Sequence, residues 1–358
     1  MNKEKTLSMI NELSAAPGVS GFEDEAVRLI RRFGEGLGDW SEDAMRNLYL
    51  RRPEKKSGLP MLLLDAHSDE VGFMVRAIRP SGVLEFVCLG GWVPSNVPSH
   101  RVLIRNMDGN WIPGIVASKP PHFLSEAEKK QTPEISEMVI DVGASGSQEI
   151  REDYRIAMGA PIVPDVSFEY SAERDVMTGK AFDDRLGCAA ILQILRELEG
   201  IDLPVQITAA FASQEEMGLR GAMVSAQIVR PDIAISFEGS PADDTLAEPY
   251  AVQTAIKKGP MLRHFDVKMI TNPRFQRFAL DLAEKRGIPS QEAVRTGGST
   301  NAGVIHVTGK AVPSIVIGLP VRYIHTHYGI ASYQDFENTV KLGCELIKNL
   351  NKDVIDTF

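Results

Sequence analysis

Acidic and imidazole side chains follow a series of apolar runs in this chain, at the points where predicted β-strands end. In open α/β sheets, ligands bind outside the carboxyl ends of the strands, so residues far apart in sequence can converge on one crevice. Oxygen and imidazole ligands suit divalent metal ions. The pattern therefore predicts a site for two metal ions and indicates a hydrolytic chemistry. The candidate residues are His67, Asp183, Glu215, Glu216, Glu238 and His325.

His67 has a candidate orienting group close by. A metal-ligating imidazole usually donates its other N–H to a carboxylate, which fixes the tautomer and raises the basicity of the ligating nitrogen. Asp69 lies two residues further on, and it points to the same side if the strand continues. A lone histidine near a strand end is more often a hydrogen-bonded core residue. The flanking carboxylates weaken that alternative.

Glu215 and Glu216 are adjacent, and they follow an apolar run that begins at Val205. Neighbours in a strand point to opposite faces, but the backbone turns at a strand end, so one carboxylate can bind metal while the other faces the bound water. A metal lowers the pKa of its water to about 7, and a carboxylate that is not a ligand can then move the proton. Taken alone, such a pair is more typical of a solvated loop than of a metal site.

Asp183 and Asp184 open a predicted helix, where a carboxylate is favourable for the helix dipole alone. Capping is therefore one interpretation. The other is a bridge between two cations that lie about 3.5 to 4 Å apart. Glu238 and His325 would complete the two sets of terminal ligands. His327 competes with His325 for this role, and the pattern barely separates the two histidines.

The composition is that of an ordinary globular chain, with 358 residues, 43% of them hydrophobic, and a formal net charge of -9. Dispersed Lys and Arg in an acidic chain argue against nucleic acid as a partner. Cys88, Cys188 and Cys344 have no CxxC spacing, so oxygen and imidazole must hold any metal. Residues 1–10 lack a signal-peptide core, and no segment approaches the roughly 20 apolar residues of a membrane span. We expect a cytoplasmic chain without a membrane partner.

Two kinds of sequence pattern divide the chain. Residues 1–70 and 165–358 show the alternation of an α/β domain, whereas residues 71–164 offer short β-type runs separated by Gly, Pro and Asn. The division predicts an α/β domain interrupted by a small barrel-like or sandwich-like insert, with candidate ligands on both sides of it. The β-type runs of the insert are residues 83–87, 101–105, 111–116 and 138–141.

Helices are predicted wherever apolar residues recur at helical spacing. Ser20-Gly-Phe-Glu23 has the pattern of a capping box, in which a serine and a glutamate satisfy the first backbone amides of a helix, and it predicts that a helix opens there. The other predicted helices cover residues 4–14, 187–198, 273–286 and 332–350.

Seven segments form a specific series along nearly the whole chain. They are Asp65-Ala-His67-Ser-Asp69-Glu70-Val-Gly-Phe73, Gly90-Gly-Trp92, Ser118-Lys-Pro-Pro-His122, Ile140-Asp-Val-Gly-Ala-Ser145, Gly179-Lys-Ala-Phe-Asp183-Asp-Arg-Leu-Gly-Cys188, Gln214-Glu-Glu216-Met-Gly218-Leu-Arg-Gly221 and Arg322-Tyr-Ile-His325. In this order and spacing, the chain resembles the M42 family of metallo-aminopeptidases, the tetrahedral aminopeptidases related to glutamyl and deblocking aminopeptidases. The resemblance implies a phosphorylase/hydrolase-like α/β sandwich with an inserted assembly domain.

The resemblance also implies how two divalent ions, zinc or cobalt with manganese as an alternative, would be held. His67, Asp183 and Glu238 would bind one ion. Asp183, Glu216 and His325 would bind the other, which makes Asp183 the bridging ligand. This set is carried over from the family, residue by residue, onto matching positions.

Two further residues take roles from the resemblance. Asp69 would orient the imidazole of His67, and Glu215 would be the general base that activates a water bridging the two metals and then protonates the departing amine. Family members remove single residues from the free N-terminus of peptides. They form homo-oligomers that look like twelve-subunit tetrahedra built from dimers, with an interior chamber that admits unfolded peptides.

The chain departs from the family pattern at three places. Glu238 stands where the family usually has Asp, so the charge is kept on a side chain one methylene longer. Asn301 replaces an Asp and removes a negative charge from a loop near the expected pocket. Thr326-His327-Tyr328 replaces a Ser-Pro-type continuation. We expect hydrolysis to persist and specificity to differ.

Two other functions compete with an aminopeptidase. A glycoside hydrolase also uses two carboxylates, but the histidines would then be unexplained. A decayed, peptide-binding assembly is the other alternative, marked by Glu238 and Asn301; the retention of Glu215 and Glu216 argues against it. Within the first class, an acylated amino acid is a further candidate substrate.

Specificity for the cleaved residue is open at the level of sequence. Lys257, Lys258 and Arg295 lie near Gly-containing turns, and each could place a cation in the pocket for the first residue. Each is also typical of a solvated surface charge.

Overall fold

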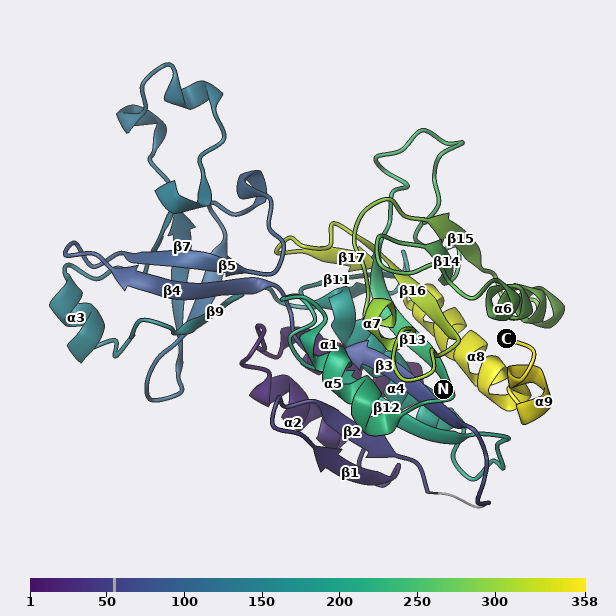
Figure 1. Cartoon of the computed structure of the whole chain (residues 1–358). Helices are drawn as coiled ribbons and strands as arrows, with labels where there is room; N and C mark the ends of the chain where they lie inside the picture. Colours follow the sequence, from purple (N-terminus) through teal and green to yellow (C-terminus); the bar gives the residue numbers. More distant parts are fainter. Residues whose placement is uncertain (54–55) are drawn as a thin grey trace.

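A twisted sheet of 11 strands forms the larger part of the molecule in the computed structural model, which describes residues 1–53 and 56–358 (Figure 1). Nine strands follow one another in the sheet, and β14 (Met261–Phe265) and β15 (Gln291–Val294) extend it beside β16. The nine are, in spatial order, β1 (Asp39–Glu42), β2 (Leu48–Arg51), β12 (Gln206–Ala212), β3 (Met61–His67), β13 (Ile233–Pro241), β16 (Ser314–Arg322), β17 (Gly329–Ala331), β11 (Val176–Gly179) and β10 (Glu169–Ser171).

The four central strands, β12, β3, β13 and β16, are parallel, so their carboxyl ends lie at one edge of the sheet. Ala212 at the end of β12 is in register with His67 at the end of β3, and Glu238 in β13 is in register with Gly318 in β16. These strands are almost entirely buried, as expected for parallel strands covered on both faces. The topology therefore brings His67, Glu215 and Glu238 toward one edge.

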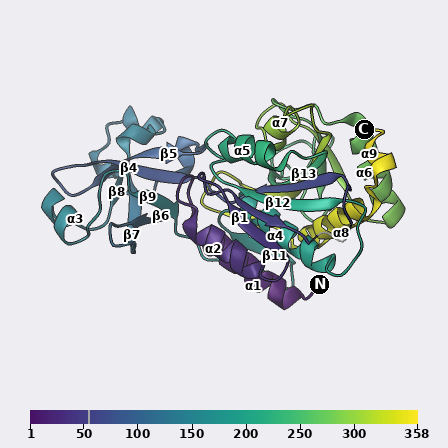
Figure 2. The same cartoon turned by 60° about the horizontal axis from the view of Figure 1, so that its bottom comes forward.

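Helices cover both faces of the sheet (Figure 2). On one face α4 packs on β3 and β13, and α8 and α1 pack on α4; on the other face α5 packs on β12 and α7 packs on β13 and β16. Alternate residues of β3 point to opposite faces of the sheet. Leu62 and Leu64 pack in the core on the first face, and Leu63 packs in the core on the second. The helices are α1 (Lys3–Ala15), α2 (Asp24–Phe33), α4 (Phe182–Glu197), α5 (Arg220–Val229), α6 (Pro273–Arg286), α7 (Ala302–Ile305), α8 (Tyr333–Asn349) and α9 (Lys352–Ile355).

A closed six-stranded barrel stands to one side of the sheet (Figure 1). It has its own core, which includes Phe73, Ile104 and Ile140 and is separate from the cores of the sheet. Short helical turns and α3 (Ser147–Glu152) connect the strands. In order round the barrel the strands are β4 (Gly72–Ile78), β5 (Leu84–Leu89), β8 (Val139–Asp141), β7 (Trp111–Ala117), β6 (Arg101–Arg105) and β9 (Pro161–Pro164). The predicted fold class, an α/β domain with a small barrel-like insert, is confirmed.

The predicted capping box at residues 20–23 is wrong. The helix α2 does begin nearby, at Asp24, but Glu23 is its N-cap and makes no side-chain capping bond. The Ser20 hydroxyl instead donates to the carboxylate of Asp69 at 2.6 Å. A hydrogen bond to a carboxylate is stronger than one between neutral groups, and it takes the serine away from the helix end.

Within the described residues, no helix combines the length and the apolar character needed to cross a membrane.

Candidate metal centre

The predicted site residues come together at the carboxyl edge of the central strands. His67 ends β3, Glu238 lies in β13, Asp183 lies at the start of α4, and the loop after β16 carries His325. Three overlapping groups of these side chains have ligand atoms within 4.8 Å of one another. The groups are His67, Asp183 and Glu238; Asp183, Glu216 and His325; and His67, Glu215 and Glu216. The first two are the two ligand sets predicted from the sequence.

Asp183 lies between the two imidazoles. Its Oδ1 is 3.2 Å from Nε2 of His67, and its Oδ2 is 3.5 Å from Nε2 of His325. One oxygen thus faces each histidine, which is the arrangement that a bridging carboxylate needs. Asp184 points elsewhere, because its carboxylate accepts from the backbone N–H of Gly187 and from that of His67. Asp183 therefore has the position expected of a bridge between two cations, and Asp184 has the position expected of a helix-capping residue.

Both imidazoles have an acceptor for the proton on Nδ1. Nδ1 of His67 lies 3.2 Å from the backbone oxygen and 3.3 Å from Oδ1 of Asp69. Nδ1 of His325 lies 2.9 Å from the backbone oxygen of Gly91, in the segment that follows β5. Oxygen acceptors at Nδ1 favour the tautomer whose Nε2 lone pair is free, and both Nε2 atoms face Asp183.

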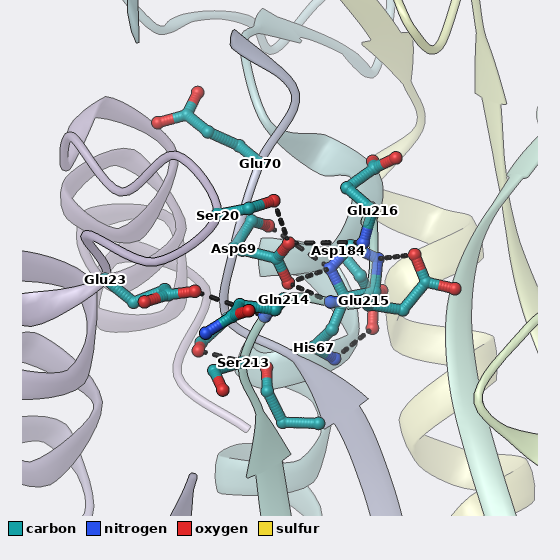
Figure 3. A network of polar contacts seen from close by, with 12 residues as sticks. Ser20, Glu23, His67, Asp69, Glu70, Asp184, Ser213, Gln214, Glu215 and Glu216 are labelled. Atoms are coloured by element: carbon teal, nitrogen blue, oxygen red, sulfur yellow. Dashed lines mark hydrogen bonds and ion pairs between the residues drawn. The ribbon is translucent and has the colours of Figure 1, made fainter. Parts of the chain in front are cut away.

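Asp69 fixes the loop that carries the two glutamates (Figure 3). Its Oδ1 accepts from the backbone N–H of Glu215 at 2.9 Å, and its Oδ2 accepts from that of Glu216 at 3.2 Å. The side chains then separate, since Oε2 of Glu216 lies 3.5 Å from Nε2 of His325, whereas Oε2 of Glu215 lies 4.0 Å from Nε2 of His67. One completely buried carboxylate thus holds an imidazole and two backbone amides together.

His325, and not His327, joins the cluster. The ring of His327 is buried and stacks on His100, with centroids 4.0 Å apart, and it also lies close to Trp92. Burial and the nearby His100 lower the pKa of His327 to about 3, so its ring is neutral. The geometry favours His325 over His327 as the candidate ligand, because the chain turns between them.

Burial raises the pKa values of the three glutamates in the cluster, whereas hydrogen bonds to His325 and His67 outweigh burial and hold the pKa of Asp183 below its ordinary value. The pKa of Glu215 rises to about 8 and that of Glu216 to about 7, chiefly through burial and also through the neighbouring carboxylates. Burial, followed by the charges of Glu215 and Asp183, raises the pKa of Glu238 well above its ordinary value. For His325, hydrogen bonding to Asp183 and the charge of Glu216 outweigh burial and raise the pKa to about 10. The glutamates are therefore crowded enough to retain protons near neutral pH, and bound cations would favour their charged forms.

This donor set fits two divalent cations. Four carboxylates supply up to four negative charges, which two divalent ions would neutralise, and two imidazoles would supply Nε2 as a ligand after losing the proton shared with Asp183. Buried charges are expected to be paired or to coordinate metals. Oxygen and nitrogen donors without thiolate suit zinc, cobalt and manganese, so the residues do not select among these metals.

A cleft of about 280 Å³ opens over the cluster. Arg295 lies in its wall, as the sequence suggested for one of three cations, with Nη1 2.8 Å from Asp243. Arg263 also lines it and was missed, because a single arginine inside the run Met261–Phe265 carries no motif. Lys257 and Lys258 do not line this cleft.

Asn301 faces the interior, although its loop reaches the cleft at residues 297–299. The side chain is 1% exposed and lies beside Asp65, a buried residue of β3. Burial raises the pKa of Asp65 to about 7, and Asn301 lowers it in part. The charge that Asn301 removes is therefore lost from the interior and not from the cleft. An amide at this position avoids placing a second carboxylate next to Asp65.

The fold and the donor set are typical of a metal-dependent α/β hydrolase, and comparisons with known proteins specify which. The model of the M42 glutamyl aminopeptidase family matches residues 47–342. The chain is 33% identical over 348 residues to the glutamyl aminopeptidase of Lactococcus lactis subsp. cremoris, with 97% of each chain covered. It is 30% identical over 352 residues to the lysyl aminopeptidase of Pyrococcus furiosus, with 96% of each covered. The chain belongs to the M42 family and is a hydrolase of the aminopeptidase class.

Solved structures agree with this assignment. The TET aminopeptidase of the marine sediment archaeon Thaumarchaeota archaeon SCGC AB-539-E09 superposes with a TM-score of 0.94 at 36% identity, covering 99% of both chains. The Pyrococcus horikoshii TET1 peptidase, which can assemble into a tetrahedron or a large octahedral shell, superposes with a TM-score of 0.86 at 26% identity, covering 96% of this chain and 100% of that one. The neighbours of this fold include homo-oligomeric peptidases.

Proposed function

We propose that the chain is a metal-dependent aminopeptidase that hydrolyses the N-terminal peptide bond of short, unfolded peptides. The observation that carries the proposal is the convergence of His67, Asp183, Glu216, Glu238 and His325 into the two ligand sets, with Glu215 beside them. Membership of the M42 family supports the reaction class.

Glu215 is the general base in this proposal. Its carboxylate lies within 4.0 Å of Nε2 of His67, and burial keeps its pKa near neutrality, at about 8. A base of this kind takes a proton from the attacking water and returns it to the departing amine, so that one group serves both transfers. The hydrogen bond from its own N–H to Asp69 fixes where that carboxylate can reach.

Two divalent cations, when bound, would lower the pKa of water and polarise the scissile carbonyl. His67, Asp183 and Glu238 would hold one of them, and Asp183, Glu216 and His325 the other. Asp69 orients His67, as the contact to Nδ1 supports. The oxygen and nitrogen donors do not distinguish zinc, cobalt and manganese. We propose zinc or cobalt on the basis of the family resemblance.

The cleft supports recognition of a single N-terminal residue. Its volume of about 280 Å³ suits one side chain and the adjoining peptide bond, and Arg263 and Arg295 stand in its wall. Both guanidinium groups are already paired, with Asp266 and Asp243 respectively. Related enzymes are named for glutamyl and for lysyl residues, so the preferred side chain is a matter for a substrate panel.

Assembly is the remaining part of the proposal. We propose residues 1–70 and 165–358 as the catalytic domain and residues 71–164 as the unit through which dimers join into a tetrahedral dodecamer. The homo-oligomeric TET peptidases among the structural neighbours support this. We place the protein in the cytoplasm, without nucleic-acid or membrane partners.

Hydrolysis of aminoacyl chromogenic amides by metal-stripped protein, with zinc, cobalt or manganese added back, tests the reaction. We expect turnover only with metal and only when the amine is free, and N-acetylated amides serve as matched controls. Turnover of a glycoside, or of acetylated amides in preference to free amines, would overturn the proposal. Absence of turnover with every metal and every amide would favour a decayed site.

A further inference from the structure

The turn between α1 and α2 reaches the metal centre through Ser20. The Ser20 hydroxyl donates to Oδ2 of Asp69 at 2.6 Å, and both residues are buried. The same Oδ2 accepts from the backbone N–H of Glu216, while Oδ1 accepts from that of Glu215. Figure 3 shows Asp69 between Ser20 on one side and the glutamate loop on the other. Ser20 therefore fixes the rotation of the carboxylate that orients His67.

Glu23 forms a second contact between this turn and the same loop. Its Oε1 accepts from the N–H of Gly21 at 2.7 Å and from that of Gln214, next to Glu215, at 3.1 Å. Its Oε2 is buried and has no hydrogen-bond partner among the described groups. A buried polar atom without a partner lowers the free energy of unfolding. A gain in protein stability therefore does not explain why a carboxylate stands at position 23.

The turn is also anchored independently of these two side chains. Glu70 accepts from the N–H of Gly18 at 3.1 Å and pairs with Nζ of Lys180 at 2.6 Å, and Arg185 donates to the backbone oxygen of Ala16 at 3.0 Å. Loss of the Ser20 hydroxyl would thus leave the turn in place. This separates the effect of Ser20 on the site from its effect on folding.

We infer that Ser20 and Glu23 are positioning residues for the metal centre: Ser20 sets the orientation of Asp69, and Glu23 holds the loop of Glu215 and Glu216. The inference rests on the proposed function for its catalytic consequence alone. Neither residue touches a candidate ligand, so both act through Asp69 and the loop backbone. Mutation of a group that orients a metal ligand typically changes metal affinity or activity by about 10 to 100-fold, and Ser20 acts on such a group, Asp69.

Ser20→Ala is the primary test, with cobalt as the probe. Cobalt affinity is measured by absorbance titration of metal-stripped protein without substrate, and kcat and KM are measured on an aminoacyl amide. We expect cobalt affinity to fall by about tenfold and kcat to fall similarly, with KM within about twofold, because the change misaligns the site and not the cleft. Ser20→Thr, which keeps the hydroxyl, is expected to restore both.

Ser332→Ala is the matched control. The Ser332 hydroxyl also donates to a carboxylate, that of the half-buried Asp175 at 2.7 Å, and neither residue belongs to the cluster. Ser332→Ala is expected to lower the melting temperature of the metal-free protein at least as much as Ser20→Ala does. Its cobalt affinity is expected to equal that of the wild type. Wild-type cobalt affinity in Ser20→Ala, or a loss equal to that in Ser332→Ala, would overturn the inference.

Glu23→Ala provides a second variant if Ser20→Ala does not fold, and it is expected to weaken cobalt binding while Glu23→Gln, which keeps an acceptor oxygen, does not. Equal cobalt affinity in these two variants and the wild type would contradict the role of Glu23. Because cobalt binding needs no substrate, the outcomes separate the two proposals. A wild-type protein that binds cobalt and hydrolyses no amide defeats the proposed function alone, whereas an active enzyme unaffected by Ser20→Ala defeats the positioning role alone.

Discussion

At the residue scale, the adjacent Glu215 and Glu216 have different surroundings, and the roles proposed for them rest on this difference. Glu216 faces His325 together with Asp183, whereas Glu215 faces His67 at a longer distance. The backbone of both is held by Asp69, so their separation is fixed. In the proposed mechanism, Glu215 moves a proton while its neighbour Glu216 binds a metal ion.

We predict that Glu215→Gln lowers kcat by about 10² to 10⁴-fold, the usual contribution of a general base. The amide keeps the shape of the side chain and cannot take the proton. Metal analysis after dialysis is expected to find the same number of ions per chain as in the wild type. A variant that loses an ion together with its activity would identify Glu215 as a ligand, in the third group of side chains.

Substitutions of Glu238 test whether this residue, one methylene longer than the usual Asp, binds a metal ion. We predict that Glu238→Gln loses one of two ions, because it removes a negative charge from the set with His67 and Asp183, whereas Glu238→Asp keeps both. Inductively coupled plasma analysis of dialysed protein measures the ratio. Two ions in Glu238→Gln at submicromolar free metal would show that Glu238 is not a ligand.

Residue types and their strand-end positions predicted the members of the cluster, but not which neighbour would join it. His325 has a left-handed backbone (φ 57°), and the chain turns so that His327 enters an aromatic cluster two residues later. Spacing alone does not fix the direction of a side chain in such a turn. For the same reason Ser20 matched a capping pattern, while its partner, Asp69, lies 49 residues away.

At the scale of elements, the close approach of β13 to the start of α4 sets the position of Asp183. A Cβ on Gly239 would lie 2.6 Å from Cα of Asp183, so only glycine allows this approach. The strand thus presents Glu238 and makes room for the candidate bridge in adjacent residues.

We predict that Gly239→Ala destabilises the protein by about 1 to 3 kcal/mol, as overpacking does, and weakens cobalt binding. Gly146→Ala is the control, since its new Cβ would meet no atom closer than 3.7 Å. Thermal melts with and without cobalt measure both effects. Wild-type stability and cobalt affinity in Gly239→Ala would show that the approach of β13 is not required.

Periodicity predicted the regular elements well, because their apolar faces are buried in the way that amphipathic patterns require. The helix expected at residues 273–286 is α6 (Pro273–Arg286), and the run expected at residues 101–105 is β6. The order of strands in the sheet could not be predicted, because β12 pairs with β2 and β3 across more than a hundred residues. That non-local pairing is what brings Glu215 to His67.

At the scale of the whole molecule, the inserted barrel domain also contacts the site, because the backbone oxygen of Gly91 lies 2.9 Å from Nδ1 of His325. If the chain assembles as a closed shell, its active sites face a chamber. We predict a native mass of twelve times 39.3 kDa by analytical ultracentrifugation. A small folded protein with a free N-terminus should resist cleavage, whereas the same chain kept unfolded by reduction should be shortened. Equal cleavage of the two forms, at equal concentration, would argue against a chamber.

The most direct measurement is anomalous scattering from crystals of the cobalt-loaded protein, recorded on both sides of the cobalt absorption edge. We expect two peaks per chain, one bounded by His67, Asp183 and Glu238 and the other by Asp183, Glu216 and His325, with Asp183 between them. A single peak in the presence of excess cobalt, a peak held by Glu215, or none at this edge of the sheet would contradict the two-metal centre.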